Sequence, residues 1–337
     1  MRSRIALACV SLAVVAVLSV PQFRARIVGL NQDQSLSLRL ATNVWSGYEP
    51  LYLARKLGYY DDRSVRLVEC SSASQVIRSF RNKAIEVAAL TLDEALLLQE
   101  DGYDIRVILV TDISHGGDVI LAKPELADLT ELRGRNVGVE HTALGAYVLT
   151  QALQRAGMSA ADVKVVPLEI HEHESAFDEG TVDAVVTFEP VRSRLLAKGA
   201  TTVFDSSQMT DEIVDVLVVR SETIKDSPEK IAILLSGWFS ALKHLRERPE
   251  KASQELAERL RLEPRAVLAS FDGIRFPDLG ENLLLLGGTR PKLSKIAERL
   301  AKVMVEQKLL QREVDVSELF SALPLKQIKE TPTLTDE

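Results

Sequence analysis

The chain has 337 residues, of which 46% are hydrophobic and 26% are charged, which is the composition of a folded soluble protein with two domains or one large one. Its formal net charge is −7 and it shows no basic stripe, which argues against a nucleic-acid partner because phosphate binding requires clustered Lys and Arg. Cys70 has no partner cysteine after the N-terminal apolar run, so we expect no disulfide within the mature monomer.

The first residues form a targeting segment. Arg2 and Arg4 precede an uncharged apolar run from Ile5 to Val20. This run is long for the core of a signal peptide and short for a membrane span of about 20 residues. We therefore expect residues 1–22 to be a signal peptide or a retained N-terminal anchor. The protein is then expected in the periplasm or on the outer face of the cytoplasmic membrane.

Strand-like and helical patterns alternate through the body of the chain, which predicts an α/β fold with parallel sheets and covering helices. The expected strands are 36–41, 65–69, 87–90, 107–111, 119–122, 136–139, 163–167, 184–188, 202–204 and 214–219. The expected helices are 50–57, 74–81, 92–100, 145–156, 175–179, 190–198, 228–246, 249–261, 264–270 and 291–306. The last four begin with proline, which suits the first turn of a helix.

Two segments resemble each other, namely Asp118-Val-Ile-Leu-Ala-Lys123 and Asp215-Val-Leu-Val-Val-Arg220. They enclose about ninety residues that contain their own strand and helix units, so we interpret them as paired connections between two lobes, with hinge positions at Asp118 and Asp215. Common strand composition is the alternative explanation. The expected boundaries are 36–118 and 220–325 for lobe 1, 119–219 for lobe 2, and 326–337 for a frayed tail.

Ligands of open α/β sheets bind beyond the carboxyl ends of the strands, and this rule selects the candidate ligand-binding residues. In lobe 1 they are Trp45, Gly47, Tyr48, Ser72, Thr91, Asp93 and Asp112; in lobe 2 they are Glu140, Thr142, Tyr147 and Glu189. Ser72 lies in a serine cluster before a helix, where it either binds an anion or serves as a helix cap. Trp45 and Tyr48 either stack on the ligand or form a hydrophobic plug.

Acidic side chains gather at the strand ends and lobe crossings, while few Lys or Arg residues occupy matching positions. This pattern suits a ligand with an amine, an amidine or several N–H donors, including a zwitterion. Helix capping is the alternative role for each single acid. No nucleophile, P-loop or dinucleotide motif is present, and His171 and His173 lack a clear third metal ligand, so we expect no catalysis, metal or cofactor.

Four stretches carry a resemblance: NVWSGYEPLYLARKLGYY, TLDEALLLQEDGYDIRVILVTD, DLTELRGRNVGVEHTALGAYVLTQAL and DAVVTFEPVRSRL. They are similar to the solute-binding proteins of the nitrate/sulfonate/taurine and thiamine-precursor ABC transporters. The resemblance implies a type II periplasmic-binding-protein fold with two crossover hinge strands. It also implies capture of a small organic nitrogen- or sulfur-containing molecule, and a permease and an ATPase as partners. We expect a monomer.

Two positions depart from the family text. His141-Thr142-Ala143 replaces a glycine–serine pair that commonly holds the anion, and Phe188 replaces a tryptophan. The first change puts a sulfonate or nitrate ligand in doubt. Two other functions stay open: a membrane-anchored sensory module with the same fold, and an enzyme like the fungal members that make the thiamine pyrimidine. The second is disfavoured because the cysteine-rich segment of those enzymes is missing.

Overall fold

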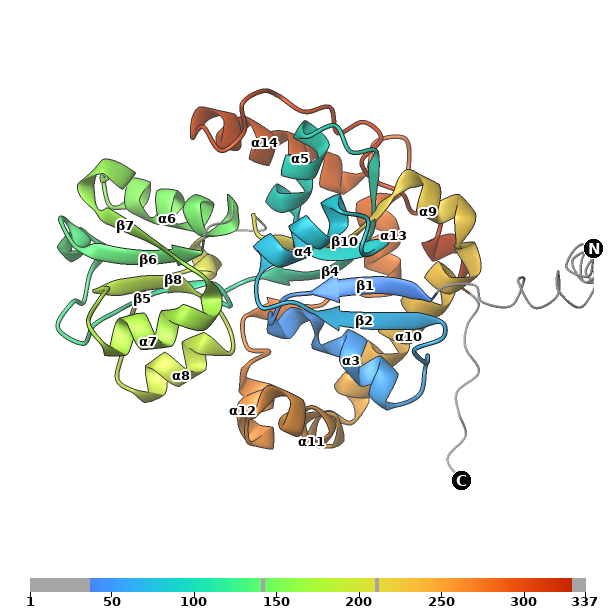
Figure 1. Ribbon diagram of the computed structural model, residues 1–337, viewed down its shortest axis with the longest axis horizontal. Coiled ribbons are helices and arrows are strands. Elements are labelled where there is room, and N and C mark those ends of the chain that lie inside the picture. The colour runs from blue at the N-terminus through green and yellow to red at the C-terminus, as the bar shows by residue number, and fades with distance from the viewer. Residues whose placement is uncertain (1–36, 141–142, 210–211, 329–337) are drawn as a thin grey trace, which may run out of the picture. The chain divides into compact units, whose positions relative to one another are not determined.

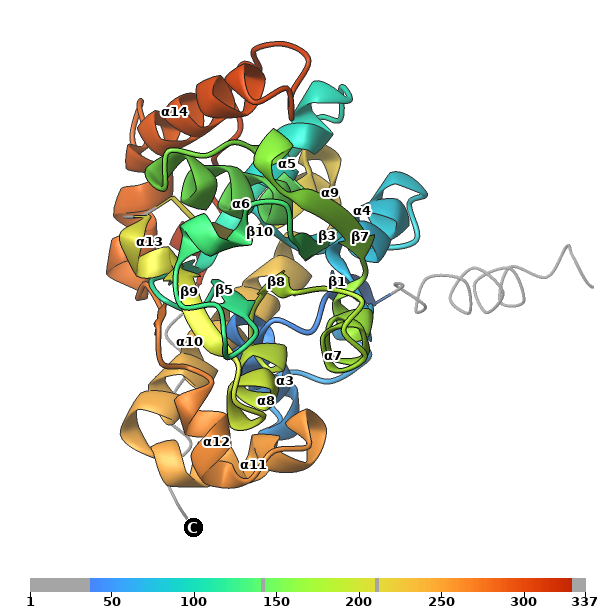
Figure 2. The same ribbon diagram turned by 90° about the vertical axis from the view of Figure 1, so that its left-hand side faces the viewer.

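The computed structural model describes residues 37–140, 143–209 and 212–328. They form two β-sheets flanked by helices (Figures 1 and 2). The expected leader (1–22), Thr142 and the end of the expected tail (329–337) lie outside these residues. None of the helices in the described ranges combines the length and the apolar character that crossing a bilayer requires.

The first sheet has six strands in the order β11-β4-β10-β3-β1-β2. Strand β1 runs parallel to β2 and β3, whereas β10 runs antiparallel to β3 and β4. Every residue of β3 is buried, which places this strand at the centre of the core. The bounds are β1 Leu38–Thr42, β2 Val65–Glu69, β3 Val87–Thr91, β4 Ile105–Ser114, β10 Val214–Arg220 and β11 Ile274–Arg275.

The second sheet has five strands in the order β7-β6-β8-β5-β9. Strand β6 runs parallel to β7 and β8, whereas β5 runs antiparallel to β8 and β9. The bounds are β5 Val119–Ala122, β6 Asn136–Glu140, β7 Lys164–Leu168, β8 Ala184–Thr187 and β9 Thr201–Asp205.

The chain passes from the first sheet to the second after β4 and returns after β9. After each passage the next strand, β5 or β10, joins its new sheet antiparallel to both neighbours. The two similar segments of the sequence thus contain the strands that follow the two passages, β5 and β10. One expected boundary differs from this pairing: residues 214–219 belong to the first sheet, because β10 takes its hydrogen bonds from β3 and β4.

Helices cover both faces of each sheet. In Figure 1, α4 and α5 lie on one side of the first sheet and α3 and α10 on the other, while α6 lies opposite α7 and α8 across the second sheet. The bounds are α3 Glu49–Lys56, α4 Ala73–Arg81, α5 Leu92–Glu100, α6 Ala143–Arg155, α7 His173–Asp178, α8 Val191–Ala197, α9 Ser221–Asp226, α10 Pro228–Glu247, α11 Pro249–Leu260, α12 Pro264–Ala269, α13 Leu279–Leu286 and α14 Lys292–Glu306.

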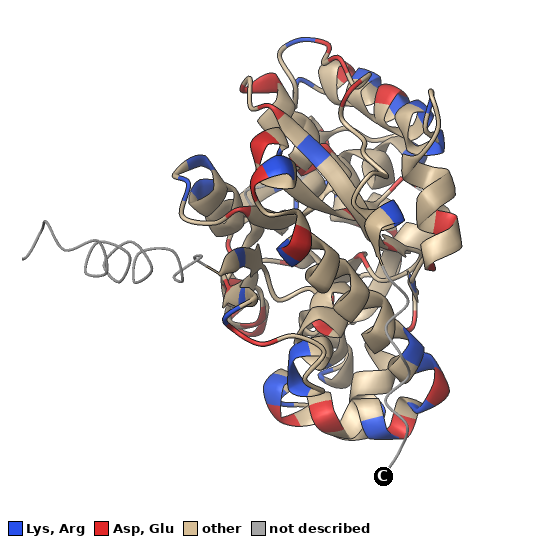
Figure 3. Ribbon diagram, turned by 90° about the vertical axis from the view of Figure 1, so that its right-hand side faces the viewer, with Lys and Arg blue, Asp and Glu red and all other residues tan. Residues whose placement is uncertain are grey.

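The C-terminal helices cover the first sheet: α10 packs on α3, α13 on β4, and α14 on α5. Prolines begin α10, α11 and α12, while Pro291 precedes α14 as its N-cap. Helices α9 and α13 were not predicted. On the side drawn in Figure 3, basic and acidic segments are interspersed along the ribbon.

Candidate functional site

Six carboxylates lie buried near the carboxyl ends of the strands of the two sheets. Asp215 at the start of β10 is paired in register with Thr91 of β3 on one side and Asp112 of β4 on the other. In the second sheet Glu140 ends β6, and Asp118 directly precedes β5. None of the six is more than 6% exposed; they are Asp93, Glu94, Asp112, Asp118, Glu140 and Asp215.

Four of these carboxylates line a cavity of about 20 Å³, which is room for about one water molecule. Both lobes contribute to it: Glu94 comes from α5 and Asp215 from β10 of the first lobe, Glu140 comes from β6 of the second lobe, and Asp118 lies at the passage between the sheets. No Lys or Arg of the described ranges lines this inner cavity. Its lining is Asn43, Trp45, Ala73, Thr91, Glu94, Asp118, Glu140, Leu144, Phe188 and Asp215.

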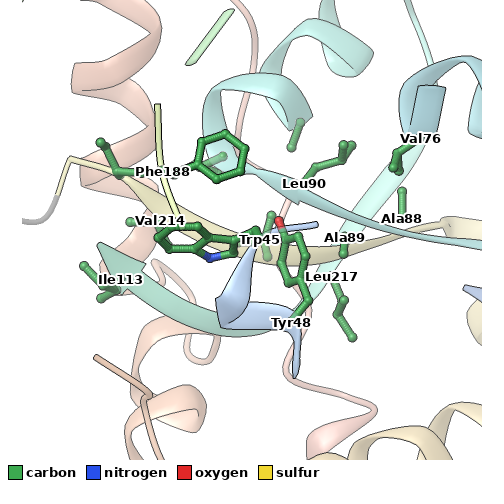
Figure 4. Close-up of a cluster of buried hydrophobic side chains, with 14 of the residues drawn as sticks. Trp45, Tyr48, Val76, Ala88, Ala89, Leu90, Ile113, Phe188, Val214 and Leu217 are labelled. Carbon is green, nitrogen blue, oxygen red and sulfur yellow. The ribbon is translucent and has the colours of Figure 1, made fainter. Parts of the chain in front are cut away.

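The loop after β1 fixes two of the acids through its aromatic rings. The indole Nε1–H of Trp45 donates to Asp112 Oδ1 at 3.1 Å, and the Tyr48 hydroxyl donates to Asp215 Oδ1 at 2.5 Å. Phe188 of the second lobe packs edge-on against Trp45 with a centroid distance of 5.6 Å (Figure 4). A Cβ at Gly47 would overlap the Trp45 indole and the Asp112 carboxylate, so glycine is required at this position.

A hydrogen bond joins the two lobes at the start of α4. The Ala73 N–H donates to Glu140 Oε1 at 3.2 Å. The N-terminal end of α4, where the serine cluster was expected to bind an anion, is therefore already met by a carboxylate of the other lobe. Ser72 is the N-cap residue, but its side chain makes no capping bond, and its buried Oγ has no hydrogen-bond partner.

Burial changes the protonation of these acids. It raises the pKa of Asp112, Asp118 and Glu140 to about 7 each, because desolvation disfavours the charged form. Burial also raises the pKa of Asp93 to about 6, and it holds the pKa values of Glu94 and Asp215 well above the ordinary range. The cluster therefore retains protons near neutral pH unless a cation compensates its charge.

The structure separates the predicted site residues into three groups. Trp45, Thr91 and Glu140 line the inner cavity, as do the predicted hinge residues Asp118 and Asp215. A second group is buried next to the lining: Gly47, Tyr48, Ser72, Asp93 and Asp112. The remaining two described residues, Tyr147 and Glu189, do not line it.

These two side chains are engaged within the second lobe. The Tyr147 hydroxyl donates to Glu212 Oε2 at 2.9 Å. The fully buried Glu189 accepts bonds from Arg192 Nη1 at 3.0 Å and from the backbone N–H and hydroxyl of Ser193 at 3.2 and 3.0 Å. Glu189 thus serves the first turn of α8 in this arrangement.

Four other residues of the lining were not among the predicted ligand-binding residues, namely Asn43, Ala73, Glu94 and Leu144. A signal for Glu94 was present, since Thr91-Leu-Asp-Glu94 has the spacing of a capping box, and the Glu94 carboxylate accepts the Thr91 N–H at 3.1 Å. Within the described part of the chain, no group of three or more His, Cys, Asp or Glu is placed to hold a metal ion. The acids thus surround the cavity without converging on one point.

Comparison with known proteins identifies the family. The model of the NMT1-like family matches residues 31–261, which is more than half of the chain. The chain belongs to the NMT1-like family. It is 20% identical over 259 residues to a protein of Escherichia coli K12 named as an aliphatic sulfonates-binding protein, with coverage of 76% of this chain and 79% of that protein.

Solved structures share the fold. The alkanesulfonate-binding protein SsuA of Xanthomonas axonopodis pv. citri, bound to MOPS, superimposes with a TM-score of 0.69 and 18% identity, covering 82% of this chain and 95% of SsuA. The desulfurization enzyme DszB superimposes with a TM-score of 0.63 and 17% identity, covering 86% and 97%. The expected two-lobed periplasmic-binding-protein fold and the resemblance to this solute-binding family are confirmed.

Proposed function

We propose that this member of the NMT1-like family is the extracytoplasmic solute-binding component of an ABC importer, and that its lobes close on a small organic molecule with a cationic nitrogen group. The family and the fold support a binding protein. The ligand class is supported by the inner cavity, where Glu94, Asp118, Glu140 and Asp215 meet without a described Lys or Arg in the lining. In this proposal the molecule is released unchanged.

The charge of the cavity decides between ligand classes. A sulfonate or nitrate placed there would be repelled at short range by each of these carboxyl groups that has lost its proton, because the site is poorly solvated. An ammonium or amidinium group would instead donate charge-assisted hydrogen bonds to the same oxygens. An organic cation also suits the site better than a metal ion does, because the acids are distributed around the cavity.

Closure is proposed to occur about the two passages between the sheets, next to Asp118 and Asp215. The Ala73–Glu140 hydrogen bond and the Trp45–Phe188 ring contact join the lobes in the closed arrangement. The closed protein would act as a monomer and dock on a membrane permease that is driven by a cytoplasmic ATPase.

Thermal unfolding with simple probe ions at constant ionic strength tests the ligand class. Methylammonium at about 100 times its dissociation constant is expected to stabilise the protein by about 2.7 kcal/mol, whereas methanesulfonate and nitrate are not. Glu140→Gln should lose this response. The matched variant Glu179→Gln, at an exposed position of the same lobe, should keep it. Stabilisation by the anions alone would overturn the proposal.

A further inference from the structure

A second cavity of about 200 Å³ lies at the seam between the lobes. The first lobe contributes Val44, Ser71 and Leu260 to its lining, and the second lobe contributes Ile170, Pro190 and Val191. This outer cavity is about ten times larger than the inner one, which by itself holds no more than a small group.

The two cavities share their loops. After β1, Asn43 lines the inner cavity and Val44 lines the outer one. After β2, Ala73 lines the inner cavity and Ser71 lines the outer one. After β8, Phe188 lines the inner cavity and Pro190 the outer one. Each of these three loops thus contributes to both cavities, which places the cavities next to each other along the seam.

The outer cavity contains two arginines, but their charges are already compensated. Arg259 Nε donates to Glu49 Oε2 at 2.9 Å, its Nη1 pairs with Glu69, and its guanidinium lies 3.2 Å from the Tyr52 ring centroid. Arg194 pairs with Glu174. The guanidinium groups therefore offer no surplus positive charge to a ligand.

Apart from these paired charges, Ser71 and His171, the lining favours an uncharged group. Val44, Ile170, Val191 and Leu260 present aliphatic carbon, and burial of such surface stabilises a bound apolar group. This character contrasts with the inner cavity, where carboxylates dominate. The chemical difference between the adjacent cavities indicates a ligand with two chemically different ends.

We propose that the ligand is an organic cation with an uncharged, mainly apolar tail, whose cationic head binds in the inner cavity while the tail fills the outer one. This inference rests on the proposed function, because the inner carboxylates must hold the head. Both cavities straddle the seam, so closure of the lobes would enclose head and tail together.

Titration calorimetry of the full chain with methylamine, butylamine, hexylamine and phenethylamine at pH 8 tests the tail. Each added methylene should raise the affinity about fourfold until the outer cavity is filled. Leu260→Trp should remove this dependence on length without weakening methylamine binding. Val191→Phe provides a second way to fill the cavity, and the control Leu284→Trp, at an exposed leucine of α13, should behave as the wild type. Circular dichroism checks each fold.

The outcomes separate the two proposals. Amines that bind with one affinity whatever their length would overturn the tail while leaving the cationic head in place. If amine affinity still rises with chain length in both Leu260→Trp and Val191→Phe, and both variants are well folded, the tail binds elsewhere and the tail proposal is also overturned. If none of the amines binds, the proposed function fails, and the tail fails with it.

Discussion

Replacement of Asp118 by Asn should stabilise the protein at alkaline pH. Burial raises the pKa of Asp118 from 3.8 to about 7, with Asp93 adding to the rise and a bond to Ser114 opposing it. One pKa unit corresponds to about 1.4 kcal/mol, so this rise in pKa means that ionising the Asp118 carboxyl costs about 4 kcal/mol more in the folded state than in the unfolded chain.

The sign follows from proton binding. Between pH 4 and about pH 7 the folded protein holds the Asp118 proton while the unfolded chain has released it, so the free energy of unfolding falls as the pH rises. Asparagine does not ionise. The variant should therefore match the wild type at pH 4 and exceed it by as much as about 4 kcal/mol at pH 8.

Urea denaturation at pH 4, 6 and 8 measures this difference. Asp226→Asn, at an exposed residue that ends α9, is the matched control and should change little at any pH. If the free energies of unfolding of Asp118→Asn and the wild type differ by the same amount at pH 4, 6 and 8, the reasoning is refuted, because ionisation of Asp118 then does not destabilise the folded state.

Three further predictions concern neighbouring groups. Methylammonium binding should release protons near pH 7 and strengthen as the pH rises towards 8, because the cation replaces protons on Asp118 and Glu140. Calorimetry in two buffers of different ionisation enthalpy measures this, and equal heats would contradict it. Gly47→Ala should lower the free energy of unfolding in urea by about 1–3 kcal/mol because the added methyl group overpacks the site. Gly280→Ala, which has room for a methyl group, should not lower it, and equal stabilities of the two variants would contradict the predicted clash. Glu189→Gln should lower stability by about 1–3 kcal/mol through its bonds to Arg192 and Ser193 and leave methylammonium affinity unchanged; lost affinity in a folded variant would place Glu189 in the site.

Much of the fold could be predicted because its signals are local. The fully buried strand β3 is a mainly apolar run, the helix α5 that follows it begins with the spacing of a capping box, and α5 was predicted with its observed bounds. The placement of β10 depended on pairing between residues more than a hundred positions apart. The strand before it, β9, belongs to the second sheet, so only the hydrogen bonds to β3 and β4 show that β10 belongs to the first sheet.

The site was predictable at the level of strand ends but not of side-chain direction. Glu140 ends β6 and Glu189 follows β8, yet Glu140 reaches across to Ala73 while Glu189 bonds to the first turn of α8. That choice depends on which donors the folded backbone presents nearby. The sequence names Arg192 and Ser193 as neighbours of Glu189, but it does not show that Ala73 lies beside Glu140.

The positions of Asp118 and Asp215 connect ligand charge with closure. Each acid lies beside a passage between the sheets and also lines the inner cavity, and each is at or just before the start of the strand that runs antiparallel in its sheet. Ionising both without a counter-charge would bring like charges together where the lobes are joined, which opposes the closed arrangement. A bound cation removes this repulsion. In the proposed mechanism, the same two carboxylates therefore recognise the ligand and make closure depend on it, without a separate sensing element.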